Sequence, residues 1–292
     1  MDHDGDGIDD ILSGSYDPGD VWLFRGLGKG RYEKGRVLVD QNGVAIVHHP
    51  VELVRYHERK QKAGGEEDEA TLQARVASFG SWPAPVDWDG DGDLDLLIGS
   101  FQGGIYLRTN VGTRQKPEYS ATSTAIGITV HRHAAPVVAD WDGDGKWDLV
   151  VGAGDGSVTW FRNTGAPGEP AFGKGQTLVT AKASDKFLRQ YLAPGQAAAP
   201  GVRAQICVAD YDLDGKLDLL VGDYNDVKEL RADLSPAEKT EVDQLATVER
   251  ELLAEAKPNQ AALAEITKKR ERFCSGEPTR RSHVWLYRRT GP

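Results

Sequence analysis

The stretch DWDGDGDLDLLIG at residues 87–99 decides the fold. Its first nine residues follow the pattern D-x-D-x-D-G-x-x-D, and the same pattern occurs at 2–10, 140–148 and 210–218. Each copy is followed by an apolar stretch that ends in glycine, namely ILSG, LLIG, LVVG and LLVG. Four copies in the same register indicate a repeat protein, because recurrence of this kind marks structural units that pack side by side.

Acidic residues at the first, third, fifth and ninth positions of each copy predict a calcium site. Carboxylates held together without a partner repel one another, and a divalent cation removes that repulsion. Calcium takes about six to eight oxygen ligands, which include carboxylates, a backbone carbonyl and water. Glycine at the sixth position permits a sharp turn around the ion, and the seventh residue would offer its carbonyl oxygen. The predicted ligands are Asp2, Asp4, Asp6, Ile8 and Asp10; Asp87, Asp89, Asp91, Asp93 and Asp95; Asp140, Asp142, Asp144, Lys146 and Asp148; and Asp210, Asp212, Asp214, Lys216 and Asp218.

The pattern also matches the start of an EF-hand loop, but two features argue against an EF-hand. The twelfth position, which would carry a bidentate glutamate, holds Ser13, Ile98, Val151 and Val221. The flanking runs are apolar or β-branched, which is typical of strands rather than helices. The sequence therefore predicts a loop that connects two strands.

Each copy contains signals for about four strands. A short apolar strand precedes the loop, the run after the loop is a second strand, and a third follows a glycine-rich turn. The third strands are VWLFRG at 21–26, IYLRTN at 105–110, VTWFRN at 158–163 and VWLYRR at 284–289. A weaker fourth segment is centred on Tyr32, Tyr119 and Phe172. Four strands a unit match a propeller blade of about 40–50 residues, so we predict an all-β propeller of about four to five four-stranded blades.

On these loops and strands, the chain resembles the FG-GAP/VCBS repeat family, whose integrin-like blades carry DxDGDGxxD calcium loops. The fourth copy departs from the family pattern at Leu213, where glycine is usual. The resemblance implies a calcium-binding propeller that holds about four Ca²⁺ ions, similar to large secreted VCBS proteins of bacteria. It implies a secreted, periplasmic or cell-surface location, where calcium is abundant enough for weak sites.

We expect one propeller domain over residues 1–292, with an α-helical hairpin at 235–273 inserted into the last blade. Ser235-Pro236-Ala237-Glu238 is a capping box with proline at the first helical position. The hairpin is interpreted either as an arm or lid that binds a partner, or as a decoration whose apolar stripe packs on the blade. The chain begins inside the first loop and has no signal peptide, so we also expect N-terminal truncation.

Two sets of residues are candidates for ligand binding. The second loop position is aromatic in Trp88, Trp141 and Tyr211, and a ring of such side chains suits stacking on sugars. The alternative is that each fills the gap to the next blade. His131 and His133 share one face if they lie on a strand. They would then act as a pair of bases in polysaccharide β-elimination or bind a second metal. The alternative is that they lie on the surface or pack within the blade.

The composition limits the classes of function. A net charge of −10 without a basic block argues against nucleic-acid or anionic-membrane partners, and no apolar run is long enough to span a membrane. The leading function is a non-catalytic extracellular module that binds a glycan or a protein. The alternatives are a polysaccharide lyase or glycoside hydrolase on the same scaffold, and a purely structural part of a larger surface protein. The oligomeric state and a disulfide between Cys207 and Cys274 stay open, and Cys207 is expected in the core.

Overall fold

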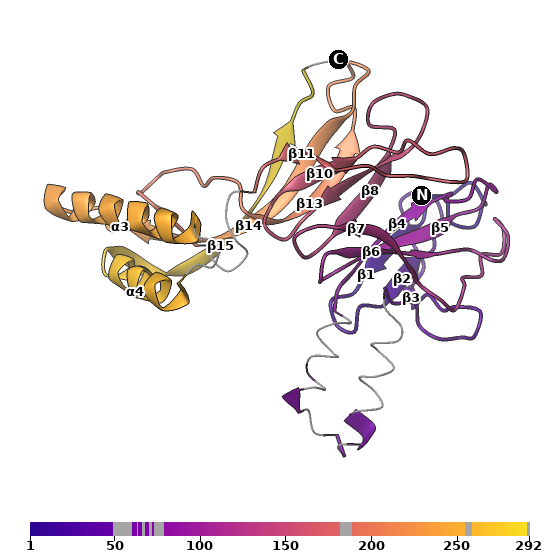
Figure 1. The fold of residues 1–292 in the computed structure, drawn as a ribbon, viewed down its shortest axis with the longest axis horizontal. Coiled ribbons are helices and arrows are strands. Elements are labelled where there is room, and N and C mark those ends of the chain that lie inside the picture. Colours follow the sequence, from indigo (N-terminus) through magenta and orange to yellow (C-terminus); the bar gives the residue numbers. More distant parts are fainter. Residues whose placement is uncertain are drawn as a thin grey trace.

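The strands form four sheets arranged as a four-bladed β-propeller, which confirms the predicted all-β fold (Figure 1). The computed structural model describes residues 1–48, 60–62, 64–65, 68–69, 72, 79–181, 189–254 and 259–290. The charged stretch at 57–75 lies largely outside the described residues. Each acidic loop belongs to one sheet, so the four copies of the sequence pattern correspond to four blades.

The blades follow one another in chain order. The first contains β1 (Ile11–Gly14), β2 (Val21–Phe24) and β3 (Arg36–Val37). The second contains β4 (Ser81–Val86), β5 (Asp95–Ser100), β6 (Gly104–Arg108) and β7 (Thr124–Thr129). The third contains β8 (Ala135–Ala139), β9 (Asp148–Gly152), β10 (Val158–Phe161) and β11 (Gln176–Val179). The fourth contains β13 (Val202–Ala209), β14 (Asp218–Leu230) and β15 (Cys274–Tyr287), and β12 (Arg189–Leu192) pairs in parallel with the outer half of β14.

The acidic loop connects the inner strand of a blade to its second strand. It joins β4 to β5, β8 to β9 and β13 to β14, and the strands of each pair are antiparallel. As a result β5, β9 and β14 have a partner strand on both sides. The corresponding strand of the first blade, β1, pairs with β2 alone among the described residues.

The outer strands begin later than the sequence suggested. Tyr32 and Phe172 each make a single bridge, to Gly26 and Asn163, and Tyr119 makes two, to Asn110 and to Asp40. The outer strands β3, β7 and β11 start only after these bridges. In the second and third blades the side-chain oxygen of Asn110 or Asn163 accepts backbone N–H groups on either side of the turn, which interrupts regular pairing.

The hydrophobic core is divided among the contacts between consecutive blades. One cluster joins the first and second blades and includes Val21, Leu23, Leu96 and Ile98. A second joins the second and third blades, and a third joins the third and fourth blades. Among the described residues no buried cluster joins the fourth blade to the first. The second and third strands therefore supply the main contacts between blades.

Glycine at the end of the second strand lets neighbouring blades approach closely. A Cβ atom added to Gly14, Gly99 or Gly152 would lie 1.6, 2.0 or 2.3 Å from a carbonyl oxygen of the next blade's Ser81, Ala134 or Ala204. Any larger residue at these positions would push the blades apart. The corresponding Gly222 of the fourth blade has no such neighbour, since its closest contact is Gln205 of its own sheet at 3.5 Å.

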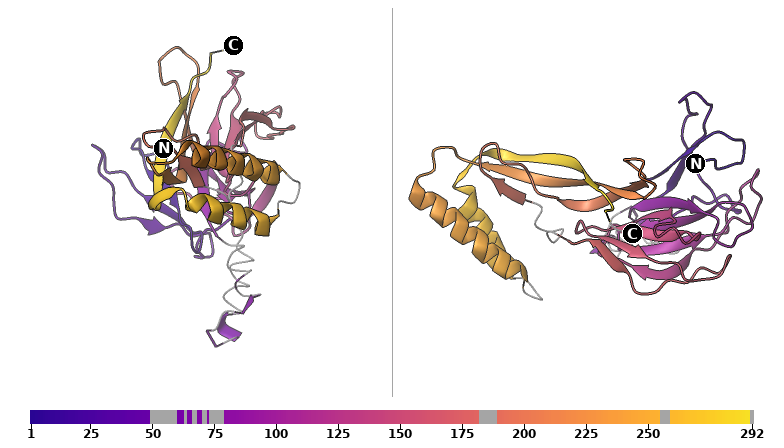
Figure 2. Two further views of the ribbon diagram at one scale, coloured as in Figure 1. Left: turned by 90° about the vertical axis from the view of Figure 1, so that its left-hand side faces the viewer. Right: turned by 90° about the horizontal axis from the view of Figure 1, so that it is seen from above.

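The strands β14 and β15 extend beyond the fourth blade and carry a pair of helices away from the sheets (Figures 1 and 2). The helices are α3 (Pro236–Ala254) and α4 (Gln260–Glu271). Leu234, Val242 and Phe273 form a small buried cluster with Leu230 at the end of β14. Val242 of α3 thus packs against the ends of the two long strands, while α4, with Leu263 and Ile266 buried, also packs against α3. No helix in the described part of the chain is long and apolar enough to cross a membrane.

Both cysteines are free thiols. Cys207 on β13 lies opposite Leu220, and Cys274 on β15 lies opposite Leu230, so both face the same strand ten residues apart. At about 3.3 Å a residue along a strand, this separation is far too long for a disulfide. The expectation that Cys207 lies in the core is wrong, because its side chain is exposed on the face of the fourth blade that no further blade covers.

Candidate metal centres

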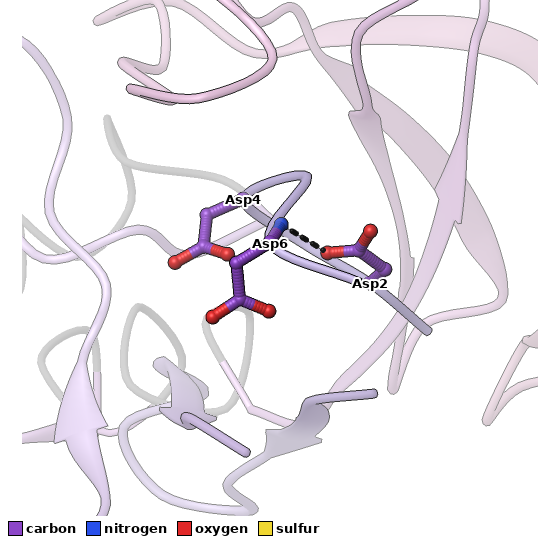
Figure 3. Close-up of side chains that lie close together, drawn as sticks. All are labelled: Asp2, Asp4 and Asp6. Carbon is purple, nitrogen blue, oxygen red and sulfur yellow. Dashed lines mark hydrogen bonds between the residues drawn. The ribbon is translucent and has the colours of Figure 1, made fainter. Parts of the chain in front are cut away.

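Each loop gathers carboxylates closely enough to share one cation. In every copy three carboxylate oxygens lie within 4.8 Å of one another. Figure 3 shows the first loop, in which the backbone N–H of Asp6 donates to Asp2. The groups are Asp2, Asp4 and Asp6; Asp87, Asp89 and Asp91; Asp140, Asp142 and Asp148; and Asp210, Asp212 and Asp218.

The loop backbone is curled by its own carboxylates. In the third loop the N–H groups of Gly143 and Gly145 donate to the two oxygens of Asp140, each at 2.9 Å. The seventh residue donates its N–H to the fifth aspartate, as Lys146 does to Asp144 at 3.0 Å. Ile8, Asp93 and Lys216 make the same bond in the other loops. These short bonds pre-form a ring of oxygens around the turn.

The fourth position of the loop is in the left-handed backbone region. Gly5, Gly90 and Gly143 have φ of 71°, 79° and 75° there. Leu213 adopts φ 60° at the same position of the fourth loop, with its side chain exposed to solvent. The departure from the repeat pattern is therefore accommodated without a change of loop shape, although a leucine is strained in this region.

The ninth aspartate ties the loop to the third strand. Asp10, Asp95, Asp148 and Asp218 are all buried. One oxygen of each accepts the N–H of the second loop residue, at 2.8, 2.9, 3.2 and 3.1 Å. The other accepts an N–H just beyond the third strand, from Gly26, Asn110, Asn163 and Arg289, at 2.7, 2.7, 2.7 and 2.9 Å. The ninth carboxylate thus has a structural role in addition to its position beside the other carboxylates.

Three of the four loops are each contacted by an arginine of their own blade. Arg25 lies 2.9 Å from Asp4 and 2.8 Å from Asp6, and Arg162 lies 2.6 Å from Asp142 and 3.0 Å from Asp144. Arg288 lies 3.0 Å from Asp212. All three occupy the same position after the third strand, where the second blade has Thr109. The first and second loops each carry a fifth acid, Asp9 and Asp93. Asp9 lies 3.1 Å from the N-terminal amine, whereas no described cation forms an ion pair with Asp93.

The second loop is accordingly the one with the most uncompensated negative charge. Burial, followed by the charges of Asp91 and Asp89, raises the pKa of Asp93. Burial also raises the pKa of Asp95 to about 6, although two backbone N–H groups oppose this shift. In the third loop the two carboxyls differ: burial raises the pKa of Asp148, whereas the N–H of Lys146 and the guanidinium of Arg162 lower the pKa of Asp144. A carboxylate group that resists ionisation in this way gains most from a cation.

The residues at the second loop position lie between blades, except in the last copy. His3 reaches Tyr119 of the second blade at 3.0 Å, and Trp88 packs on Trp147 and Phe172 of the third. Trp141 is buried under Arg289 of the fourth blade. Tyr211 has no following blade and is exposed. The four side chains thus mark equivalent places, and sugar binding by Trp88, Trp141 or Tyr211 stays a prediction.

The two candidate histidines do not share a face. Arg132 and His133 have φ of 52° and 44°, so the chain turns at 131–133 instead of continuing as a strand. His133 is buried with its ring against Phe101 and Trp82. His131 is half exposed, and its Nδ1 lies 4.0 Å from Asp155. The structure therefore separates a packed histidine from an accessible one.

A hollow of about 460 Å³ lies where the inner strands of the blades meet. Its walls come from β4, β8 and β13, and from β1 in the first blade. Tyr16 and Trp82 supply aromatic surface, and Ser15, Ser81 and Gln205 supply polar groups; Tyr16 is well exposed. The sequence did not predict these residues, because a lining that comes from several blades is set by how the sheets pack rather than by a local pattern.

Two overlapping segments, residues 87–151 and 140–221, match the family model of the FG-GAP-like repeat. They contain the second, third and fourth acidic loops, but not β4, which precedes the second loop, nor the outer half of β14. No curated protein matches the chain. This part of the chain, residues 87–221, is therefore similar to FG-GAP-like repeats, and the acidic loops of its blades lie within the matched residues.

Proposed function

We propose that the protein is a calcium-stabilised extracellular binding module. The observation that carries the proposal is the recurrence of three clustered loop carboxylates at the same place in all four blades. They come from loop positions one, three and five in the first two loops and from positions one, three and nine in the last two. A propeller of FG-GAP-like repeats fits a binding or structural module. The proposal goes further in three respects: that the ion is calcium, that the protein is extracellular, and which ligand it binds.

The donor atoms suit a hard cation. The loops offer carboxylate and backbone oxygens, which are the ligands that Ca²⁺ prefers, and no soft donor lies among the clustered side chains. Buried oxygens Asp4 Oδ1 and Asp93 Oδ1 accept no hydrogen bond from the described residues. A bound cation would neutralise these oxygens and remove the repulsion between neighbouring aspartates.

Direct titration tests the calcium proposal. Chelator-treated protein is titrated with CaCl₂ by calorimetry, and with MgCl₂ in parallel. We expect as many as four Ca²⁺ ions a chain, with Mg²⁺ bound more weakly because it requires a stricter octahedral arrangement. The double variant Asp87→Asn/Asp89→Asn should lose one ion, whereas Glu118→Gln, an exposed acid of the same blade, should lose none. Absence of calcium uptake at millimolar concentration would refute the proposal.

The ligand we propose is a glycan or a protein bound at the central hollow. Aromatic faces next to a side-chain amide, as in Tyr16, Trp82 and Gln205, suit stacking on sugar rings with hydrogen bonds to their hydroxyls. A screen of immobilised polysaccharides tests the glycan. Binding should be weakened at least tenfold by Trp82→Ala and unchanged by Tyr32→Ala, an exposed tyrosine elsewhere. If no glycan or protein is retained, the structural alternative is the better description.

A further inference from the structure

Three contacts between blades follow one rule. The third strand of one blade packs against the second strand of the next. Val21 and Leu23 of β2 meet Leu96 and Ile98 of β5 in the first cluster. Ile105 and Leu107 of β6 likewise meet Leu149 and Val151 of β9. In the third cluster Val158 of β10 meets Leu219 and Val221 of β14.

The fourth blade presents the same surface, and no other blade of the described residues covers it. Val284 of β15 is 70% exposed, whereas the equivalent Val21, Ile105 and Val158 are 0%, 1% and 0% exposed. Leu286 is 40% exposed, compared with 2% for Leu23 and 8% for Leu107. Tyr211 is 61% exposed, compared with 8% for Trp141. We call this surface, formed by Tyr211, Val284 and Leu286 with Cys207 beside them, the tail face.

The first blade presents the complementary surface, which is also exposed in the described part of the chain. Ile11 of β1 is 43% exposed, whereas the equivalent Leu96, Leu149 and Leu219 are 0%, 0% and 2% exposed. Ser13, two residues further on the same face of β1, is exposed as well. We call this surface the head face. Head and tail faces are the two halves of a fourth contact of the kind that the chain makes three times internally.

We propose that the tail face binds the head face of a second copy of this chain. The second copy is the occupant that the chain itself specifies, because it carries the second-strand surface that third strands bind in all three internal contacts. The contact would place Val284 and Leu286 of one copy against β1 of the other. This contact would be weaker than an internal one. In the internal contacts the glycine that ends the second strand packs against the inner strand of the next blade, and β1 has no inner strand beside it among the described residues for Gly222 to meet.

The association is head to tail. In an open dimer each copy therefore keeps one free face, whereas in a closed dimer both faces of each copy are covered. Such a heterologous contact produces larger species as concentration rises, or a closed dimer if the geometry permits. The net charge of −10 opposes association of copies, so the measurement is made in CaCl₂ and moderate salt. The contact surfaces contain none of the loop carboxylates, and failure of the association would leave the calcium proposal intact.

Sedimentation velocity of the full chain over a hundredfold concentration range tests the proposal. We expect reversible, concentration-dependent association of the wild-type chain. Val284→Asp on the tail face and Ile11→Asp on the head face should each leave only monomer. Both side chains are exposed, so the variants should melt like the wild type. Val248→Asp, at a valine on α3 that is 41% exposed, close to the 43% of Ile11, should associate normally.

Mixing the two variants decides whether the contact is head to tail. An Ile11→Asp chain keeps an intact tail and a Val284→Asp chain keeps an intact head, so the mixture should form a one-to-one dimer although neither variant associates alone. A wild-type chain that stays monomeric throughout would overturn the proposal. So would an Ile11→Asp chain that still dimerises, because tail faces would then bind each other.

Discussion

Arginine at the end of the third strand sets how much of each loop's charge is left for a cation. Arg25, Arg162 and Arg288 contact carboxylates of three loops, and Thr109 occupies the equivalent place beside the second loop. A guanidinium that bridges two loop aspartates competes for the same oxygens as a metal ion. The second loop should therefore bind calcium most tightly of the four.

Exchanging these residues tests the competition. Arg162→Gln should raise the calcium affinity of the third loop by about two- to fivefold, since a half-exposed ion pair contributes up to about 1 kcal/mol. Thr109→Arg should lower the affinity of the second loop. Calcium titration monitored by NMR of the loop glycines assigns each change to its loop. Arg250→Gln on α3 makes the same charge change far from the loops and should alter no affinity. Equal affinities in all the variants would contradict this account.

The backbone conformation of Leu213 should lower the stability of the fourth loop. Its φ of 60° lies in the region that glycine adopts freely and a leucine does not. Because the side chain is 86% exposed, little packing is lost by removing it. Leu213→Gly should therefore raise the free energy of unfolding by up to about 1 kcal/mol, measured by urea denaturation in the presence of calcium. A loss of stability would show that the leucine makes a contact that offsets the strain.

At the scale of the strand, the terminal glycine controls the approach of blades. Gly152→Ala should destabilise the fold by about 1–3 kcal/mol, because the new methyl group would meet the carbonyl oxygen of Ala204 at 2.3 Å. Gly222→Ala is the matched control, since its nearest contact is at 3.5 Å and the change should be nearly neutral. Urea denaturation of both variants gives the comparison. Equal losses would mean that backbone preference, rather than blade contact, explains the glycine.

The elements could be predicted from sequence wherever a local pattern determines them. The spacing of aspartate and glycine placed the loops, and the apolar runs placed the second and third strands. Tyr211, Val284 and Cys207 could not be placed, because an apolar position predicts a face but not whether another blade covers it. The turn at His133 depends on a positive φ that no local residue signals. The hydrogen bonds of the ninth aspartate likewise depend on a strand distant in sequence.

At the scale of the whole molecule, the acidic loops concentrate like charge within a chain of net charge −10. Of its 45 acids, sixteen occupy the first, third, fifth and ninth positions of the loops. Four bound Ca²⁺ ions would offset eight of the ten net negative charges. The ions would bind the folded loops and not the unfolded chain, so calcium should stabilise the native state by mass action. Blade packing and metal binding are therefore expected to be coupled.

Thermal unfolding with and without calcium tests this coupling most directly. One site at a hundredfold excess over its dissociation constant contributes about 2.7 kcal/mol, and each kcal/mol raises Tm by about 2–4 °C for a chain of this order of size. The melting temperature in millimolar CaCl₂ should therefore exceed that in EDTA by at least about 5 °C, and MgCl₂ should give a smaller rise. Identical melting temperatures in CaCl₂ and EDTA would contradict the claim that the loops hold calcium.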